Sequence, residues 1–116
     1  LLGLKGRKLV SAYNASKGGV VLLTQNAALE YGKYNIRVNA IAPGVFLTKQ
    51  NKNLLINPDG SYSERTKRIL SGTPYNRLGD PRELKGTLIY LLSDASAFVT
   101  GETVFVDGGF NAWCGV

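Results

Sequence analysis

A tyrosine and a lysine stand four positions apart near the start of the chain, at Tyr13 and Lys17. On a helix, residues at this spacing share a face, so the phenol and the ammonium can reach one bound molecule. A free phenol keeps its proton at neutral pH, and a nearby ammonium favours the phenolate. The pair is therefore a candidate for proton transfer. The alternative is that Tyr13 closes the edge of a core while Lys17 is a solvated surface charge.

A second stretch of chemical interest begins at a Pro-Gly break. Residues 36–42 are β-rich and end abruptly at Pro43-Gly44, which predicts a short strand and then a loop. Thr48, in this loop, could hydrogen-bond a bound amide or cap a helix that starts just after it.

The elements around these residues predict an α/β fold. Residues 11–31 have an apolar surface wider than one stripe, which predicts a helix covered on two sides, with Ser11 as N-cap and Gly32 as C-cap. A helix, a short loop and a strand form half of a parallel α/β unit, in which ligands bind beyond the carboxyl ends of strands. The loop after residue 42 is thus expected where a cofactor would lie.

The segment 49–72 is polar and weakly patterned. It holds a strong turn signal, Asn-Pro-Asp-Gly at 57–60, and a helical patch at 63–70. A segment of this length beyond a strand end is typical of a substrate lid, and equally of a variable surface insertion.

The last third predicts one more helix and one more strand. Asp80, Pro81 and Glu83 form a helix start of the capping-box type, and the helix is expected to run to about residue 93. Residues 103–106 predict a strand buried on both faces. The leucines expected to point inward are Leu84, Leu88, Leu91 and Leu92.

Composition excludes several classes of site. With 116 residues and 44% hydrophobic content, the chain is long enough for one small domain. It has no histidine and a single cysteine, Cys114, which argues against a metal site, an internal disulfide and a histidine-based triad. We find neither a membrane-span run nor a signal-peptide pattern, and expect a cytoplasmic protein.

The net charge of +6 is spread along the chain rather than gathered in a stripe. Lys33, Arg37, Lys49 and Lys52 stand singly, and we expect them to be solvated surface charges. A nucleic-acid binder is the less favoured interpretation, and salt-dependent DNA retention would test it.

Taken in order, the motifs resemble the carboxyl half of short-chain dehydrogenases/reductases. They are Tyr13-x-x-x-Lys17, Ile36 to Gly44 with Thr48 four places on, Arg77 to Pro81 before a helix, and Thr100-Gly101 with Val106 to Gly109. The resemblance implies a doubly wound, parallel, Rossmann-like sheet and NAD or NADP as cofactor.

The same resemblance assigns roles to residues. It implies that Tyr13 is the general acid/base, and that Lys17 lowers the proton affinity of Tyr13 and binds the nicotinamide ribose. It implies that segment 49–72 is the lid and that helix 11–31 packs against its mate in a homodimer, usually within a homotetramer. The residues lining the nicotinamide and pyrophosphate side would be Pro43, Gly44, Val45 and Thr48.

The family's glycine-rich turn, cofactor-selecting residue and catalytic serine precede its tyrosine and are not found in this sequence. Ser11, two places before Tyr13, is too close to be that serine. We therefore expect residues 1–116 to be the carboxyl-terminal portion of one domain, unstable and inactive alone, with exposed apolar faces.

The turn at 57–60 and the ending Val106 to Phe110 resemble family members acting on sugars and sugar acids, such as gluconate, fructuronate or mannonate. The alternatives are a 3-oxoacyl-carrier-protein reductase and, in another class, a non-catalytic binding module with the same fold. Basic residues of the segment 49–72 fit an anionic sugar acid or an acidic carrier.

Overall fold

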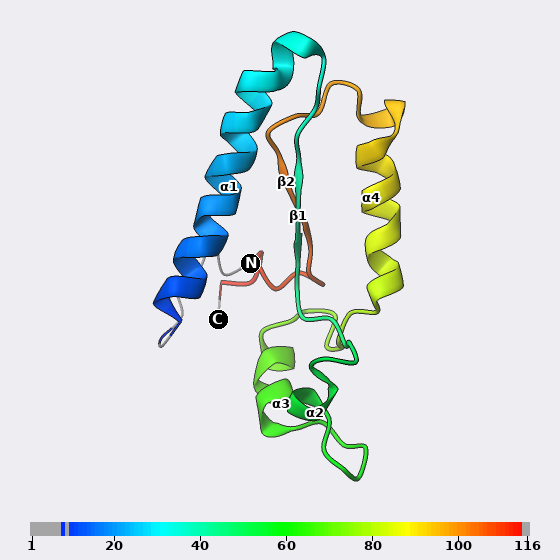
Figure 1. The fold of residues 1–116 in the computed structure, drawn as a ribbon. Coiled ribbons are helices and arrows are strands. Elements are labelled where there is room, and N and C mark those ends of the chain that lie inside the picture. The colour runs from blue at the N-terminus through cyan, green and yellow to red at the C-terminus, as the bar shows by residue number, and fades with distance from the viewer. Residues whose placement is uncertain (1–7, 9, 115–116) are drawn as a thin grey trace. The chain divides into compact units, whose positions relative to one another are not determined.

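The computed structural model describes residue 8 and residues 10–114. Two strands and a set of helices make up this part of the chain (Figure 1). In chain order they are helix α1 (Ser11–Tyr31), three-ten helix η1 (Gly32–Tyr34), strand β1 (Ala40–Pro43), helices α2 (Lys52–Leu55) and α3 (Glu64–Ser71), three-ten helix η2 (Pro81–Leu84), helix α4 (Lys85–Leu92), three-ten helix η3 (Asp94–Ser96) and strand β2 (Thr103–Val106).

Strands β1 and β2 pair in one sheet. The Ala40 N–H donates to Glu102 O at 2.8 Å, and the Gly44 N–H donates to Val106 O at 2.9 Å. Donor and acceptor advance in the same direction along both strands, so the pair is parallel. The predicted α/β class with a parallel sheet is confirmed.

The chain divides into two compact units. The first contains α1, β1 as far as Ala42, α4 from Gly86, and β2 as far as Phe105. The second contains the residues from Pro43 to Lys85 and the chain from Val106 onward.

Helix α1 has the predicted bounds and the predicted C-cap, Gly32, whereas its N-cap differs from the prediction. Val10 is the N-cap, because its carbonyl already accepts the Asn14 N–H at 2.8 Å and Ser11 is the first helical residue. Gly32 is the C-cap with φ −55°, so it is not left-handed. The backbone continues through η1, and the left-handed residue is Asn35, with φ 59°.

Within the first unit, Figure 1 shows the two strands between α1 and α4. The pattern of α1 predicts a helix covered on two sides, and the described residues do not provide that cover. Thr24 and Ala28 are the buried residues of the helix, whereas Leu29 is 82% exposed. The expected exposure of apolar faces is therefore seen.

The prediction that four leucines in and just before α4 point inward is wrong for two of them. Leu91 is buried and Leu84 is partly buried, while Leu88 and Leu92 are exposed. The helix is apolar nearly all round, so a narrow two-stranded sheet covers only part of its surface.

Strand β1 starts at Ala40 and not at the predicted residue 36. The residues just before it bind, through their side chains, the turn that precedes β2. Asn39 Nδ2 donates to Val99 O at 2.8 Å, and the Glu102 N–H donates to Asn39 Oδ1 at 3.1 Å. Arg37, expected to be a solvated charge, is instead partly buried, and its guanidinium donates to Ser96 Oγ at 2.8 Å. The same guanidinium donates to the carbonyls of Ser93 and Val99.

The second unit has its own apolar core, which Leu55, Leu70 and Leu78 form. Thr66 is fully buried on α3, and its hydroxyl donates to Leu55 O at 2.7 Å. Ser63 caps α3 by accepting the Thr66 N–H at 3.3 Å. The segment 49–72 is thus more structured than its pattern predicts, and the helix expected after Thr48 is present as α2, which starts at Lys52.

The predicted turn at 57–60 is present. The Asn57 N–H donates to Ser61 O at 2.8 Å, and Gly60 has the positive φ of 85° that favours glycine. Ile56 and Tyr62 form an antiparallel bridge on either side of the turn. Within the described residues, no helix is long and apolar enough to cross a membrane.

Candidate active site

Tyr13 and Lys17 lie side by side on the first two turns of α1. Lys17 Nζ is 5.4 Å from the centroid of the Tyr13 ring, which is within cation–π range. Tyr13 is 51% exposed, and within the described part of the chain neither its hydroxyl nor Lys17 Nζ makes a hydrogen bond. Both polar groups are therefore available to one bound molecule, and their role in proton transfer stays a prediction.

The loop from Pro43 to Thr48 begins at the end of β1 and belongs to the second unit. Gly44 passes so close to β2 that an added Cβ would lie 2.7 Å from Asp107 Cα, which only a glycine avoids. The carboxylate of Asp107 accepts the backbone N–H groups of Gly109 and Asn111 at 2.9 and 2.8 Å. The start of the loop is thus held tightly against the end of β2.

The structure rules out one of the two predicted roles of Thr48, that of a helix cap. Helix α2 begins at Lys52 with Asn51 as N-cap, so Thr48 does not cap it. The Thr48 N–H donates to Asn51 Oδ1 at 2.8 Å, and Asn51 Nδ2 donates to Phe46 O at 2.8 Å. Among the described residues, the Thr48 hydroxyl and the Val45 N–H make no hydrogen bond. They remain free for a ligand.

Val45 and Phe46 also line a cavity of about 90 Å³, on whose wall Arg77, Glu83 and Asp107 lie as well. A cavity of this size holds a few water molecules and is too small for a dinucleotide. The cavity lies between the loop 43–48 and the charged turn after α3, which contains Arg77 and Glu83.

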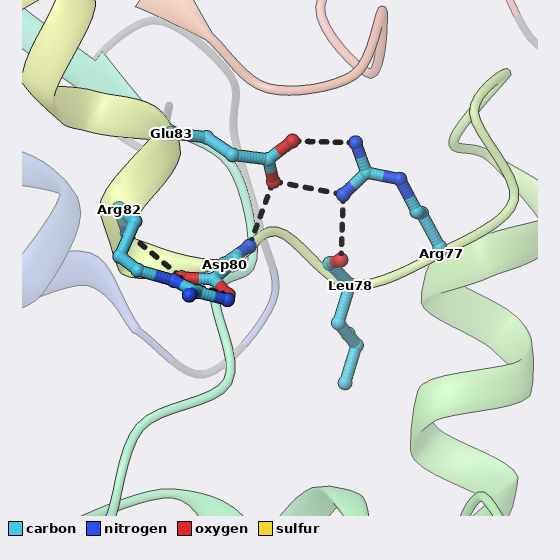
Figure 2. Close-up of polar contacts among 5 residues, drawn as sticks. All are labelled: Arg77, Leu78, Asp80, Arg82 and Glu83. Carbon is cyan, nitrogen blue, oxygen red and sulfur yellow. Dashed lines mark hydrogen bonds and ion pairs between the residues drawn. The ribbon is translucent and has the colours of Figure 1, made fainter.

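That turn carries a charged cluster where the sequence pattern predicts only a helix start. Arg77 donates from Nη2 to Glu83 Oε1 at 2.6 Å and from Nη1 to Glu83 Oε2 at 2.8 Å (Figure 2). The predicted capping box is present, since Asp80 accepts the Arg82 N–H and Glu83 accepts the Asp80 N–H, each at 2.8 Å. No sequence pattern signals the Arg77–Glu83 pair, because the two residues are six positions apart across a non-helical turn.

The hydrogen bonds of this cluster hold both acids ionised. The Arg77 guanidinium and the Asp80 N–H lower the pKa of Glu83 to about 2. The Arg82 side chain and N–H lower the pKa of Asp80 to about 2. The Glu83 carboxylate raises the pKa of Arg77.

The predicted site residues therefore form two groups. Tyr13 and Lys17 belong to the first unit, and Pro43, Gly44, Val45 and Thr48 belong to the second. Within the described residues, no cluster of three or more histidines, cysteines or acids could hold a metal ion.

The comparisons with known proteins identify the family. A family model described as enoyl-(acyl carrier protein) reductase matches residues 2–111. The chain belongs to the short-chain dehydrogenase/reductase family. It is 51% identical over 108 residues to an uncharacterised oxidoreductase, UxuB, of Bacillus subtilis, with 92% of this chain and 39% of the relative covered.

Two further members of this family carry more specific names. The 2-dehydro-3-deoxy-D-gluconate 5-dehydrogenase of Formosa agariphila is 46% identical over 112 residues, which are 95% of this chain and 40% of the relative. The crystal structure of a gluconate 5-dehydrogenase from Burkholderia cenocepacia, in complex with NADP and tartrate, has a TM-score of 0.84 at 36% identity, with 96% of this chain and 42% of that chain covered. The chain thus spans about two fifths of the length of these relatives.

Proposed function

We propose that the natural protein carrying these 116 residues is an NAD(P)-dependent oxidoreductase that acts on a sugar or sugar acid of the fructuronate, mannonate or gluconate type. Residues 1–116 are then the carboxyl-terminal portion of a single Rossmann-like domain, with a lid at about 49–72. The observation that carries the proposal is the adjacency of Tyr13 and Lys17 on α1, with both polar groups free of hydrogen bonds to the described residues. The sugar-acid names of two relatives support the substrate class.

The residues present fit a nicotinamide cofactor. A carboxamide needs one hydrogen-bond donor and one acceptor, and the loop offers the Val45 N–H and the Thr48 hydroxyl. Pro43 and Gly44 would line the same side, and Lys17 would hold the ribose hydroxyls through its ammonium. When bound, the nicotinamide supplies or accepts the hydride.

Tyr13 donates or accepts the proton that is exchanged with the substrate oxygen. In the reducing direction its hydroxyl gives a proton to the substrate oxygen, and in the oxidising direction its phenolate takes one. The Lys17 ammonium, 5.4 Å from the ring centroid, places a positive charge beside the phenol that gives or takes the proton.

The test is a steady-state assay of the natural protein with fructuronate and with an acetoacetyl thioester, each with NADH and NADPH. We expect turnover of the sugar acid, and we expect Tyr13→Phe to lower kcat by about 10²–10⁴-fold because the proton donor is lost. A Lys33→Met variant is the control, since Lys33 lies in η1, away from Tyr13 along α1. A clear preference for the thioester would overturn the sugar-acid assignment.

One observation favours a second function, the carrier-protein reductase. The matching family model is described by an acyl-carrier-protein substrate. The acetoacetyl arm of the assay decides between the two. Absence of turnover and of NAD(P)H binding in every arm would instead support a non-catalytic binding module.

We also propose self-association through α1, in a homodimer or homotetramer. Leu22, Leu23 and Leu29 are exposed on this helix, although large apolar side chains are normally covered. Light scattering of the natural protein and of a Leu23→Glu variant tests this: the variant should shift toward the monomer, and an unchanged mass would contradict it.

A further inference from the structure

The Glu83 carboxylate makes two kinds of bond at once. It accepts both arms of the Arg77 guanidinium, and it accepts the Asp80 N–H at 2.8 Å (Figure 2). Arg77 Nη1 in turn donates to Leu78 O at 3.2 Å. The ion pair is therefore tied to a backbone group on each side of Gly79.

Gly79 is the residue that joins this turn to the loop after β1. Its N–H donates to Val45 O at 3.0 Å, and its carbonyl accepts the Leu47 N–H at 3.0 Å. The ring of Phe46, which is largely buried, lies against it so closely that a Cβ on Gly79 would be 2.6 Å from Phe46 Cε1. The backbone of residues 45–47 is thus fixed by the backbone position of residue 79.

We propose that Arg77 and Glu83 are positioning residues for the loop from Pro43 to Thr48. By holding Leu78 O and the Asp80 N–H, the pair fixes Gly79, and Gly79 fixes Val45 and Leu47. The Val45 N–H and the Thr48 hydroxyl are thereby kept in place for the nicotinamide carboxamide. The consequence for the cofactor rests on the function proposed above, whereas the link between pair and loop does not.

An exposed ion pair taken alone contributes little to stability. Arg77 and Glu83 differ from such a pair because their charged groups also bind main-chain atoms, so that they set geometry as well as attract each other. The same turn provides the comparison. Arg82 makes an ion pair with Asp80, yet its guanidinium bonds only the Asp80 carboxylate.

The experiment compares Arg77→Ala, Arg77→Lys and the matched control Arg82→Ala in the natural protein. Amide hydrogen exchange is measured at Leu47 and Gly79, with Ile56, whose N–H donates to Lys52 O within the same unit, as reference. The binding of NADH and NADPH is measured by fluorescence titration.

For Arg77→Ala we expect exchange at Leu47 and Gly79 to accelerate at least about tenfold relative to Ile56 and cofactor binding to weaken by about 10–100-fold. We expect Arg82→Ala to change neither. Arg77→Lys keeps the charge and cannot form the planar fork, so it should not restore exchange to the parent rate.

Equal effects of Arg77→Ala and Arg82→Ala, no acceleration at Leu47, or full rescue by Arg77→Lys would each overturn the proposal. If the parent protein binds neither nucleotide, the proposed function fails, and the exchange rates still decide whether the pair holds the loop. General unfolding is recognised separately, because it accelerates exchange at Ile56 as well.

Discussion

Replacing Gly44 by alanine tests the close approach between the loop and the end of β2. The added Cβ would lie 2.7 Å from Asp107 Cα and 2.9 Å from Asp107 Cβ. Relaxed carbon contacts are about 3.5–4.0 Å apart, so the two backbones must separate by roughly an ångström. Asp107 cannot turn aside, because a main-chain atom is in the way and its carboxylate is bound to Gly109 and Asn111.

The cost follows from two effects. Overpacking of this kind costs about 1–3 kcal/mol. Separation of the backbones also lengthens the bond from the Gly44 N–H to Val106 O, now 2.9 Å, and a lost backbone hydrogen bond costs about 0.5–1.5 kcal/mol. We expect Gly44→Ala to lower the free energy of unfolding by about 1.5–4.5 kcal/mol.

Urea unfolding of the natural protein, followed by circular dichroism, measures this change. The matched control is Gly32→Ala, because Gly32 has φ −55° and nothing within 4 Å of its added Cβ. That variant should be neutral or more stable by up to about 1 kcal/mol. If Gly44→Ala unfolds at the same urea concentration as Gly32→Ala, the argument from close approach is wrong.

Three further predictions concern single side chains. Glu83 has a pKa lowered from 4.5 to about 2, so it stabilises the fold fully above about pH 4.5 and less as the pH falls toward 2; Glu83→Gln should flatten that part of the stability–pH curve in acid unfolding, and an unaltered curve would contradict the ion pair with Arg77. Ser63→Ala removes the cap of α3 and should cost about 0.5–2 kcal/mol in urea unfolding, against little change for Arg65→Ala at an exposed position of the same helix. Arg37→Ala leaves the buried Ser96 hydroxyl and two carbonyls without their guanidinium donor, so thermal unfolding should show a loss of about 1–3 kcal/mol; a loss below about 0.5 kcal/mol would mean that water replaces the guanidinium at no cost.

The features best predicted from the sequence are those set by neighbouring residues. Helix α1 has the predicted bounds, the capping box at Asp80 is present, and the turn at 57–60 forms with Gly60 at positive φ. Each depends on side chains within one or two turns of the backbone, so local chemistry suffices.

What could not be predicted depends on contacts between distant residues. The β-rich run 36–42 gives no sign that Arg37 and Asn39 hold residues 93–102, which delays the start of β1 to Ala40. The pairing of Phe46 with Gly79 is likewise a long-range bridge.

The candidate site likewise has one part that local spacing predicts and one part that depends on contacts between distant residues. The adjacency of Tyr13 and Lys17 follows from helical spacing alone and was predictable. The link from Arg77 to the loop passes through Glu83 and Gly79, and no periodic pattern encodes it. Burial on α4 was predicted poorly, because a helix that is apolar nearly all round does not reveal which face its own sheet covers.

The turn between Ile56 and Tyr62 offers an attachment point for a reporter. Most of the hydrogen bonds that close it come from residues 57–62, and the Asp59 carboxylate accepts both the N–H and the hydroxyl of Ser61. A small fluorescent tag inserted at this exposed tip would leave the core around Leu55 and Leu70 untouched. The segment 49–72 could then be followed in real time, as candidate substrates are added, through the light that the tag emits.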